Sequence, residues 1–220
     1  MSALLGTGAL ALWLDVAAEL DEETDEWYVR EHLPERVDVG GYLRSRRYQA
    51  EEGGPGYFSL FEARDPQALA SDGYLALVRR ISEQSQRIRG GFSNVLRNTF
   101  EVRSSGGRGV GGAMATLRLA WRGPGAADGA ALRDWMSGLL RLPGIVGVHW
   151  LQAAPEVRAQ MDAVRAVGQQ DGAVDHALLI EATRAAPLRA LRQDRLSARA
   201  LSELGWHEQG YGVYRLMYAV

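Results

Sequence analysis

The stretch WYVREHLPER at residues 27–36, followed by GYL at 41–43 and RRY at 46–48, decides the expected fold of this 220-residue chain. Apolar residues recur at helical spacing through residues 22–37, with charged residues between them, which predicts a helix. Pro34 is expected to kink or end that helix, because it lacks an amide donor. A pair of glycines then breaks the chain, and the alternating residues that follow predict a strand.

Working outward from this stretch, strand-like and helix-like segments follow one another in the same order twice. Strands are expected at residues 9–16, 42–50, 57–63, 93–102, 114–121, 146–153, 175–183 and 211–220. Helices are expected at residues 22–37, 66–81, 128–140 and 187–204, and an insertion at 155–172 also has helical character. The order βαββαβ, repeated, predicts an α+β fold of two tandem ferredoxin-like units that form one pseudo-dimeric α/β barrel.

The segment SSGGRGVGG at residues 104–112 has the composition of a flexible linker and lies near the midpoint of the chain. It predicts a first domain at residues 1–103 and a second, degenerate ferredoxin-like domain at 113–220. Its glycine spacing is not read as a phosphate-binding loop, because no helix follows it.

The motifs at residues 27–48 resemble those of the dimeric α/β-barrel superfamily, and within it the EthD-like proteins. Those proteins carry an aromatic first helix with a Trp-x4-His-x-Pro motif, then a glycine-containing break into an Arg-Arg-Tyr strand. The resemblance covers residues 8–103 well and 112–220 by pattern alone. The superfamily includes isomerases, lyases, polyketide cyclases, cofactor-free monooxygenases and haem-binding enzymes, so the fold by itself predicts no reaction.

Composition narrows the classes of partner and site. The formal net charge of −2 argues against a nucleic-acid partner, and the absence of cysteine excludes disulfides and thiolate sites. No apolar run approaches the length of a membrane span, and the first residues lack a positively charged leader, so a cytoplasmic protein without a membrane partner is expected. The four histidines lack metal-binding spacing, so no metal is predicted; haem, which needs one histidine, stays open.

His32 is the first candidate for catalysis. An imidazole at a helix end near the barrel mouth is suited to act as a general base, and Glu31 or Glu35 would orient it. The alternative is a structural role, in which His32 bonds backbone groups at the Pro34 break. If Trp135 corresponds to Trp27, the second half has a leucine where His32 would recur, which places a single site within residues 9–75.

Asp15 is the second catalytic candidate. On the first strand Trp13 and Asp15 share the face opposite the aliphatic residues, so both are expected to face the barrel interior. A carboxylate there is suited to act as acid or base, or alternatively as the ion-pair partner of an arginine.

Aromatic and arginine side chains supply the expected substrate-binding residues. On the second strand either the face with Tyr42, Arg44, Arg46 and Tyr48 or the opposite one points inward, because apolar content does not separate them. An inward arginine with tyrosine hydroxyls would suit a planar anionic ligand. The predicted substrate-binding residues are Trp13, Trp27, Arg46, Tyr48, Tyr57 and Tyr74.

These candidate residues are compatible with two functions. The first is an enzyme without a cofactor, of the lyase, isomerase or cyclase type, that abstracts a proton next to a carbonyl of a polar aromatic or polyketide-like substrate. The alternative is a non-catalytic barrel that binds a small ligand or serves as an accessory protein, and a homodimer is compatible with either. The test between them is whether the interior is a polar cavity or is filled by side chains.

Overall fold

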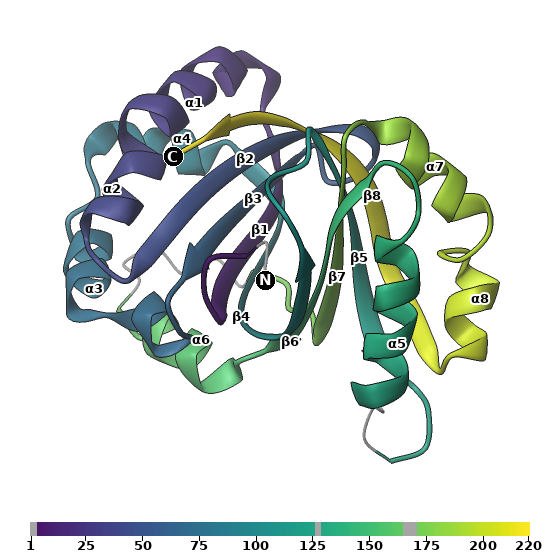
Figure 1. Ribbon diagram of the computed structural model, residues 1–220. Coiled ribbons are helices and arrows are strands. Elements are labelled where there is room, and N and C mark those ends of the chain that lie inside the picture. The colour runs from purple at the N-terminus through teal and green to yellow at the C-terminus, as the bar shows by residue number, and fades with distance from the viewer. Residues whose placement is uncertain (1–3, 126–128, 165–170) are drawn as a thin grey trace.

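Eight strands close into one antiparallel barrel at the centre of the protein, as the computed structural model shows for residues 4–125, 129–164 and 171–220 (Figure 1). The strands are β1 (Gly8–Val16), β2 (Tyr42–Gly53), β3 (Tyr57–Ala63), β4 (Phe92–Gly107), β5 (Ala113–Trp121), β6 (Ile145–Ala153), β7 (His176–Ala182) and β8 (Trp206–Ala219). Around the barrel their order is β1-β3-β2-β8-β5-β7-β6-β4. The predicted α+β barrel is therefore confirmed.

The strand order divides into two ferredoxin-like sheets. Strands β4-β1-β3-β2 form the first sheet and β8-β5-β7-β6 form the second, with each strand of one at the place of its counterpart in the other. The sheets join along two seams, β2 with β8 and β4 with β6. Each open sheet thus covers both edges of the other, and the closed barrel leaves no unpaired sheet edge.

Helices cover the outer face of each sheet (Figure 1). On the first sheet these are α1 (Asp21–Trp27), α2 (Leu33–Asp38), α3 (Asp72–Arg79) and α4 (Glu83–Gly90), and on the second α5 (Gly129–Leu140), α7 (Ala185–Gln193) and α8 (Ala198–Glu203). A π-helical turn, Tyr28–His32, joins α1 to α2, and Pro34 lies in the first turn of α2, where a missing amide costs little. Helix α6 (Pro155–Asp162) lies within the connection from β6 to β7.

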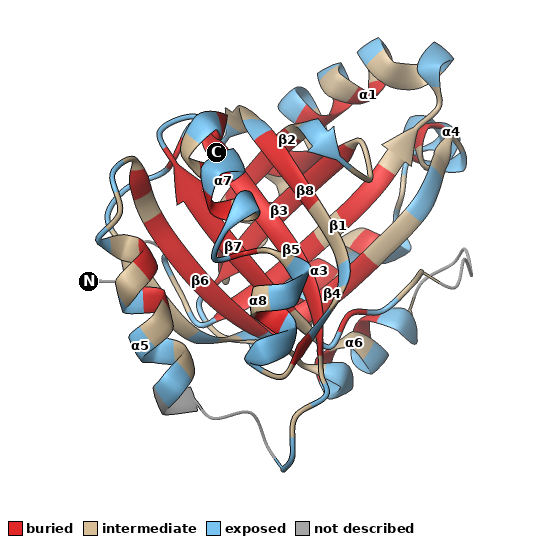
Figure 2. Ribbon diagram, turned by 90° about the vertical axis from the view of Figure 1, so that its right-hand side faces the viewer, coloured by how far each residue is buried: buried red, intermediate tan, exposed pale blue. Residues whose placement is uncertain are grey.

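The buried side chains form three clusters, of which the middle one is the barrel interior. Two clusters combine strand and helix residues and lie under the helices, whereas the third consists of inward strand residues together with Leu4 and Val174. Its large members are Trp13, Tyr48, Phe58, Phe100 and Tyr214, all fully buried. Side chains therefore fill the middle of the barrel, and Figure 2 shows buried residues along most of β3, β5, β6 and β7.

The pairing registers relate the two halves residue by residue. In β1, Ala9 lies opposite Glu62 of β3, and in β5, Met114 lies opposite Glu181 of β7. Glu62 and Glu181 are therefore equivalent positions. Arg46 of β2 and His149 of β6 are equivalent in the same way. Arg46 pairs with the residue two positions before Glu62, and His149 pairs with the residue two positions before Glu181.

The predicted linker and the last predicted helix differ from the sequence-based expectation. Ser104 to Gly107 extend β4 and pair with β6, so that only residues 108–112 connect the halves, and the two-domain division stays a prediction. The helix expected at 187–204 is divided at Asp194, which ends α7. No helix within the described part of the chain is long and apolar enough to cross a membrane.

Candidate functional site

One end of the barrel is closed by buried ion pairs. The guanidinium of Arg46 lies 2.9 Å from a carboxylate oxygen of Glu62 and 2.9 Å from one of Glu181, and all three side chains are at most 1% exposed. Backbone amides complete the closure: Leu5 N donates to Glu62 Oε2 at 2.9 Å and Gly111 N to Glu181 Oε2 at 2.7 Å. Contacts between side chains and backbone amides therefore close this end of the barrel.

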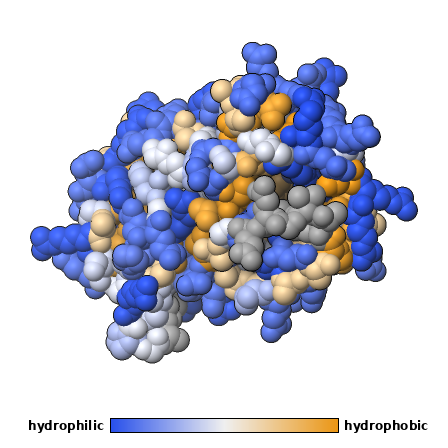
Figure 3. Space-filling model, turned by 180° about the vertical axis from the view of Figure 1, so that it is seen from behind, coloured by the Kyte–Doolittle hydropathy of each residue, from blue (hydrophilic) through white to orange (hydrophobic). Residues whose placement is uncertain are grey.

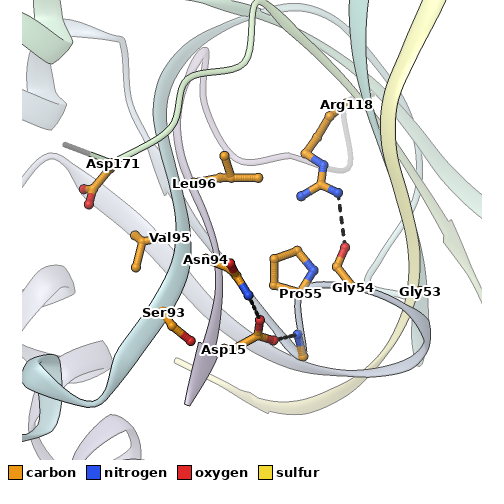
Figure 4. A pocket seen from close by; sticks show the side chains of 11 residues that line it. Asp15, Gly53, Gly54, Pro55, Ser93, Asn94, Val95, Leu96, Arg118 and Asp171 are labelled. Carbon is orange, nitrogen blue, oxygen red and sulfur yellow. Dashed lines mark hydrogen bonds between the residues drawn. The ribbon is translucent and has the colours of Figure 1, made fainter. Parts of the chain in front are cut away.

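The opposite end opens into a cleft of about 830 Å³ (Figure 4). Its walls come from the end of β1 with Asp15, the β2–β3 hairpin at 53–56, the start of β4 at 93–96, and Arg118 of β5. Asp171 adds a carboxylate at the rim. Both halves of the chain contribute, whereas the sequence placed the site within residues 9–75.

Asp15 is held in place at the cleft by two hydrogen bonds. Its Oδ1 accepts from Gly56 N at 2.6 Å and its Oδ2 from Asn94 Nδ2 at 2.7 Å. Asn94 adopts a φ of 50°, a left-handed conformation that asparagine tolerates better than most residues. The carboxylate therefore has a fixed orientation and both oxygens occupied (Figure 4).

Arg118 is the cationic group of the cleft. It is 8% exposed and donates to Gly54 O at 3.2 Å, and no carboxylate of the described residues forms an ion pair with it. Burial lowers the pKa of its guanidinium, because the charged form is partly removed from water. Gly210 of β8 makes room for the guanidinium, since a Cβ there would lie 1.9 Å from Nη2.

Aromatic side chains fill the barrel interior next to Arg118. The Trp13 indole donates from Nε1 to Thr116 Oγ1 at 3.0 Å, and its ring lies 5.0 Å from that of Phe58. Burial raises the pKa of Tyr214 to about 12, so its phenol stays neutral. Arg118 lies 5.9 Å from the Trp13 ring centroid, a cation–π distance. These rings are fully buried beneath Arg118, and the described lining of the cleft itself contains no aromatic residue.

Trp13 lies in the barrel interior and Asp15 lines the cleft, whereas the other predicted residues are dispersed. Arg46 and Tyr48 point into the interior, where Arg46 belongs to the closed end and Tyr48 is fully buried. Tyr57 lies outside, where its hydroxyl donates to Asp21 of α1. These residues do not converge on a single site.

His32, Trp27 and Tyr74 lie under the helices, outside the barrel. His32 is 6% exposed and stacks on Trp27 at 4.2 Å, and burial together with the charge of Arg36 lowers its pKa well below the usual value. Tyr74 packs on Tyr42 in the same layer. The expectation that His32 lies at the barrel mouth is therefore wrong, and its catalytic role stays a prediction.

The second strand resolves the question of which face points inward. Arg46 and Tyr48 face the interior, and Arg44 reaches the inward Glu62 at 2.7 Å. Tyr42 instead faces outward, because a bulge shifts the register between Tyr42 and Arg44. Neither of the two sets of alternating residues on β2 points inward along the whole strand.

Sequence reasoning missed Arg118 and Asn94. The available signal was Gly210-Tyr211-Gly212 in the last strand, because a glycine inside a strand often marks the close approach of another group. Both glycines have this role: a Cβ at Gly212 would lie 2.6 Å from the Tyr214 ring, as one at Gly210 would meet Arg118.

A smaller groove of about 460 Å³ lies near the end of β5, with Trp121 and His176 among its lining residues. Its histidine and the buried His32 and His149 lie away from the larger cleft, whose described lining contains no histidine. Within the described residues, no group of three or more histidine, aspartate or glutamate side chains is arranged to hold a metal ion.

Comparison with known proteins identifies the fold. No protein-family model matches the sequence, and no curated protein matches it. An anthrone oxidase-like protein of known structure is 14% identical, with a TM-score of 0.63 over 100% of this chain and 95% of its own. A candidate monooxygenase from Fusobacterium nucleatum is 8% identical, with a TM-score of 0.61 over 98% and 95%. A heme-binding protein from Thermus thermophilus is 9% identical, with a TM-score of 0.54 over 97% and 92%.

These likenesses extend along the whole chain, and at such identities they show the fold alone. The chain therefore has the dimeric α/β-barrel architecture, with both ferredoxin-like units on one polypeptide.

Proposed function

We propose that the protein binds a small organic anion in the cleft and that Arg118 holds its carboxylate or phenolate. The observation that carries this proposal is a largely buried guanidinium that lines a cleft of about 830 Å³ without a carboxylate partner among the described residues. A buried charge is costly unless it is paired, so an anionic ligand would supply the missing partner. Pro55, Val95 and Leu96 provide apolar surface in the cleft for the rest of the ligand.

The catalytic form of the proposal is a cofactor-free enzyme that removes a proton next to a carbonyl. Arg118 would stabilise the oxyanion of the enolate, and the Asp15 carboxylate would take the proton. A polar aromatic or polyketide-like substrate would meet a cation, a carboxylate and the apolar side chains of Val95 and Leu96 in the cleft. Solved proteins of this fold include one described as anthrone oxidase-like and one named as a candidate monooxygenase, which supports a small-molecule substrate.

The second candidate is a barrel that binds the same anion without reaction. It is favoured by the two hydrogen bonds on Asp15, because both carboxylate oxygens already accept donors and the group is a weaker base for that reason. It is favoured also by the filled barrel interior. An EthD-like relationship, a cytoplasmic location and a homodimer remain predictions under either candidate.

Binding is tested with phenylpyruvate, which carries a carboxylate, an aromatic ring and an enolisable carbon. Isothermal titration calorimetry should show binding to the wild type and to Arg79→Gln, an exposed arginine on α3, and a loss of at least about tenfold in Arg118→Gln. Equal affinity in all three proteins would disprove the anion site.

Catalysis is tested by NMR on the same compound. The enzyme candidate predicts that the protein accelerates exchange of the hydrogens next to the ketone with deuterium, and that Asp15→Asn abolishes the acceleration while binding persists. Binding without any acceleration identifies the non-catalytic candidate.

A further inference from the structure

We propose that Ser105, His149 and Glu181 form a nucleophile, base and carboxylate at the closed end of the barrel, where Ser105 reacts with activated esters. The three residues come from three adjacent strands: β4, β6 and β7. This site lies at the end opposite the cleft, so it is independent of the anion-binding proposal.

The hydrogen bonds form one continuous chain. Ser105 Oγ lies 2.8 Å from His149 Nδ1, and His149 Nε2 lies 3.1 Å from Glu181 Oε1. Ser105 and His149 are direct partners across the β4–β6 seam, so backbone pairing fixes their separation. Nucleophile–base and base–carboxylate contacts of this length define a serine triad by geometry, whatever the order of the residues in the chain.

Electrostatics determine which atom donates in each of these hydrogen bonds. Burial alone would raise the pKa of Glu181, but the hydrogen bond from His149 and the charge of Arg46 lower it to about 2, so it is ionised. An ionised Glu181 accepts the proton of His149 Nε2. The neutral imidazole then presents its Nδ1 lone pair to the hydroxyl of Ser105, which is the tautomer that a general base requires.

The surroundings hold the base rigid and leave the nucleophile accessible. His149 and Glu181 are fully buried, whereas Ser105 is partly exposed. Gly147 leaves space for the imidazole, because a Cβ there would lie 2.9 Å from His149 Nε2. Leu4 N approaches Ser105 Oγ at 3.4 Å, so an N–H donor lies next to the reacting oxygen.

The proposed step is ordinary nucleophilic displacement. With a fluorophosphonate, Ser105 Oγ forms a bond to phosphorus, the phosphorus–fluorine bond breaks, fluoride leaves, and His149 Nδ1 takes the hydroxyl proton. With a carboxylic ester, Oγ bonds to the carbonyl carbon and the alcohol leaves with the proton from His149. Water then releases the acid by the reverse transfer through the same base.

The test is covalent labelling of the full-length protein with a fluorophosphonate, followed by intact-mass measurement and peptide mapping. We expect one adduct per chain, on Ser105, and none in Ser105→Ala. Ser104→Ala is the matched control, because Ser104 is the neighbouring residue on the same strand, has similar exposure and lies opposite Trp150. The control should label as the wild type does. Absence of an adduct on Ser105 would overturn the proposal.

The role of His149 as the base is tested by the rate of covalent labelling. His149→Gln should lower the labelling rate by about 100-fold or more, the usual contribution of a positioned base. Because this substitution can also disturb folding, circular dichroism first establishes that the variant is folded. A folded His149→Gln protein that labels at the wild-type rate would refute the assignment. Arg118→Gln should label normally.

Discussion

Trp13 and Arg118 occupy equivalent positions in the two halves of the barrel, and the guanidinium carbon of Arg118 lies 5.9 Å from the centroid of the Trp13 ring. Trp13 lies four residues after the position on β1 that pairs with Glu62. Arg118 lies four residues after the position on β5 that pairs with Glu181. The pseudo-symmetric barrel therefore buries an aromatic ring at a position where the other half has a cation that lines the cleft.

Gly210→Ala should weaken binding of phenylpyruvate about as much as Arg118→Gln does. The added Cβ would overlap the guanidinium, whose Nη2 lies 1.9 Å from that point, so Arg118 must leave its place. Isothermal titration calorimetry measures the affinity. Gly90→Ala, at the exposed end of α4 with open space around it, is the control and should bind normally. Full affinity in Gly210→Ala would mean that Arg118 does not anchor the ligand.

Trp13→Phe should lower the free energy of unfolding by about 1–3 kcal/mol, because Thr116 loses its buried donor and a void remains where the indole lay. Denaturant unfolding measures the change. In the double variant Trp13→Phe/Thr116→Val the loss should be smaller than the sum of the two single losses, since both partners of one hydrogen bond are then absent. Strict additivity would show that this hydrogen bond does not contribute.

His32 should make the protein less stable in mild acid. Its folded pKa is lowered, so between that value and about 6.5 the unfolded chain binds a proton that the folded chain does not. Stability is therefore complete above about pH 6.5 and declines as the pH falls. His32→Phe, which retains an aromatic ring against Trp27, should reduce the loss between pH 7 and pH 5 by about 1 kcal/mol.

Glu35 contributes in the opposite direction, because burial raises its pKa and it takes up a proton on folding as the pH falls. The comparison is therefore made in a Glu35→Gln background, by denaturant unfolding at both pH values. An unchanged pH dependence after His32→Phe would contradict the lowered pKa.

Division of the chain within residues 108–112 should give two fragments that fold only together. The interior cluster takes Trp13 and Phe58 from the first half and Met114 and Tyr214 from the second, so either half alone would expose it to water. Circular dichroism and size-exclusion chromatography should show poorly folded separate fragments and a 1:1 complex on mixing. A well-folded, self-associating first fragment would contradict this expectation.

Much of the fold was predictable from local pattern. The strand Tyr57–Ala63 was expected at the residues it occupies, and the inward direction of Trp13 followed from alternation along a strand. The inward face of β2 was not predictable in the same way, because a bulge moves Tyr42 to the outer face while Arg44 reaches inward.

The site was harder to predict because its residues are distant in sequence. Asp15 and Asn94 are 79 residues apart and meet only because β1 pairs with β4. Arg118 comes from the other half of the chain, and its lack of an ion-pair partner among the described residues is a property of three-dimensional packing. His32 lies within a recognisable motif, but whether a helix presents such a residue to the sheet or to a barrel opening depends on tertiary docking.

Arg46 and His149 are equivalent by register yet chemically different, and both contact Glu181. In a barrel assembled from two identical chains, every substitution at such a position appears twice, on both sides of the symmetry axis. Two arginines, or two histidines, would then have to fit around the same pair of glutamates. Once both units are encoded by one gene, a mutation changes one side only, and the centre of the barrel can evolve residue by residue.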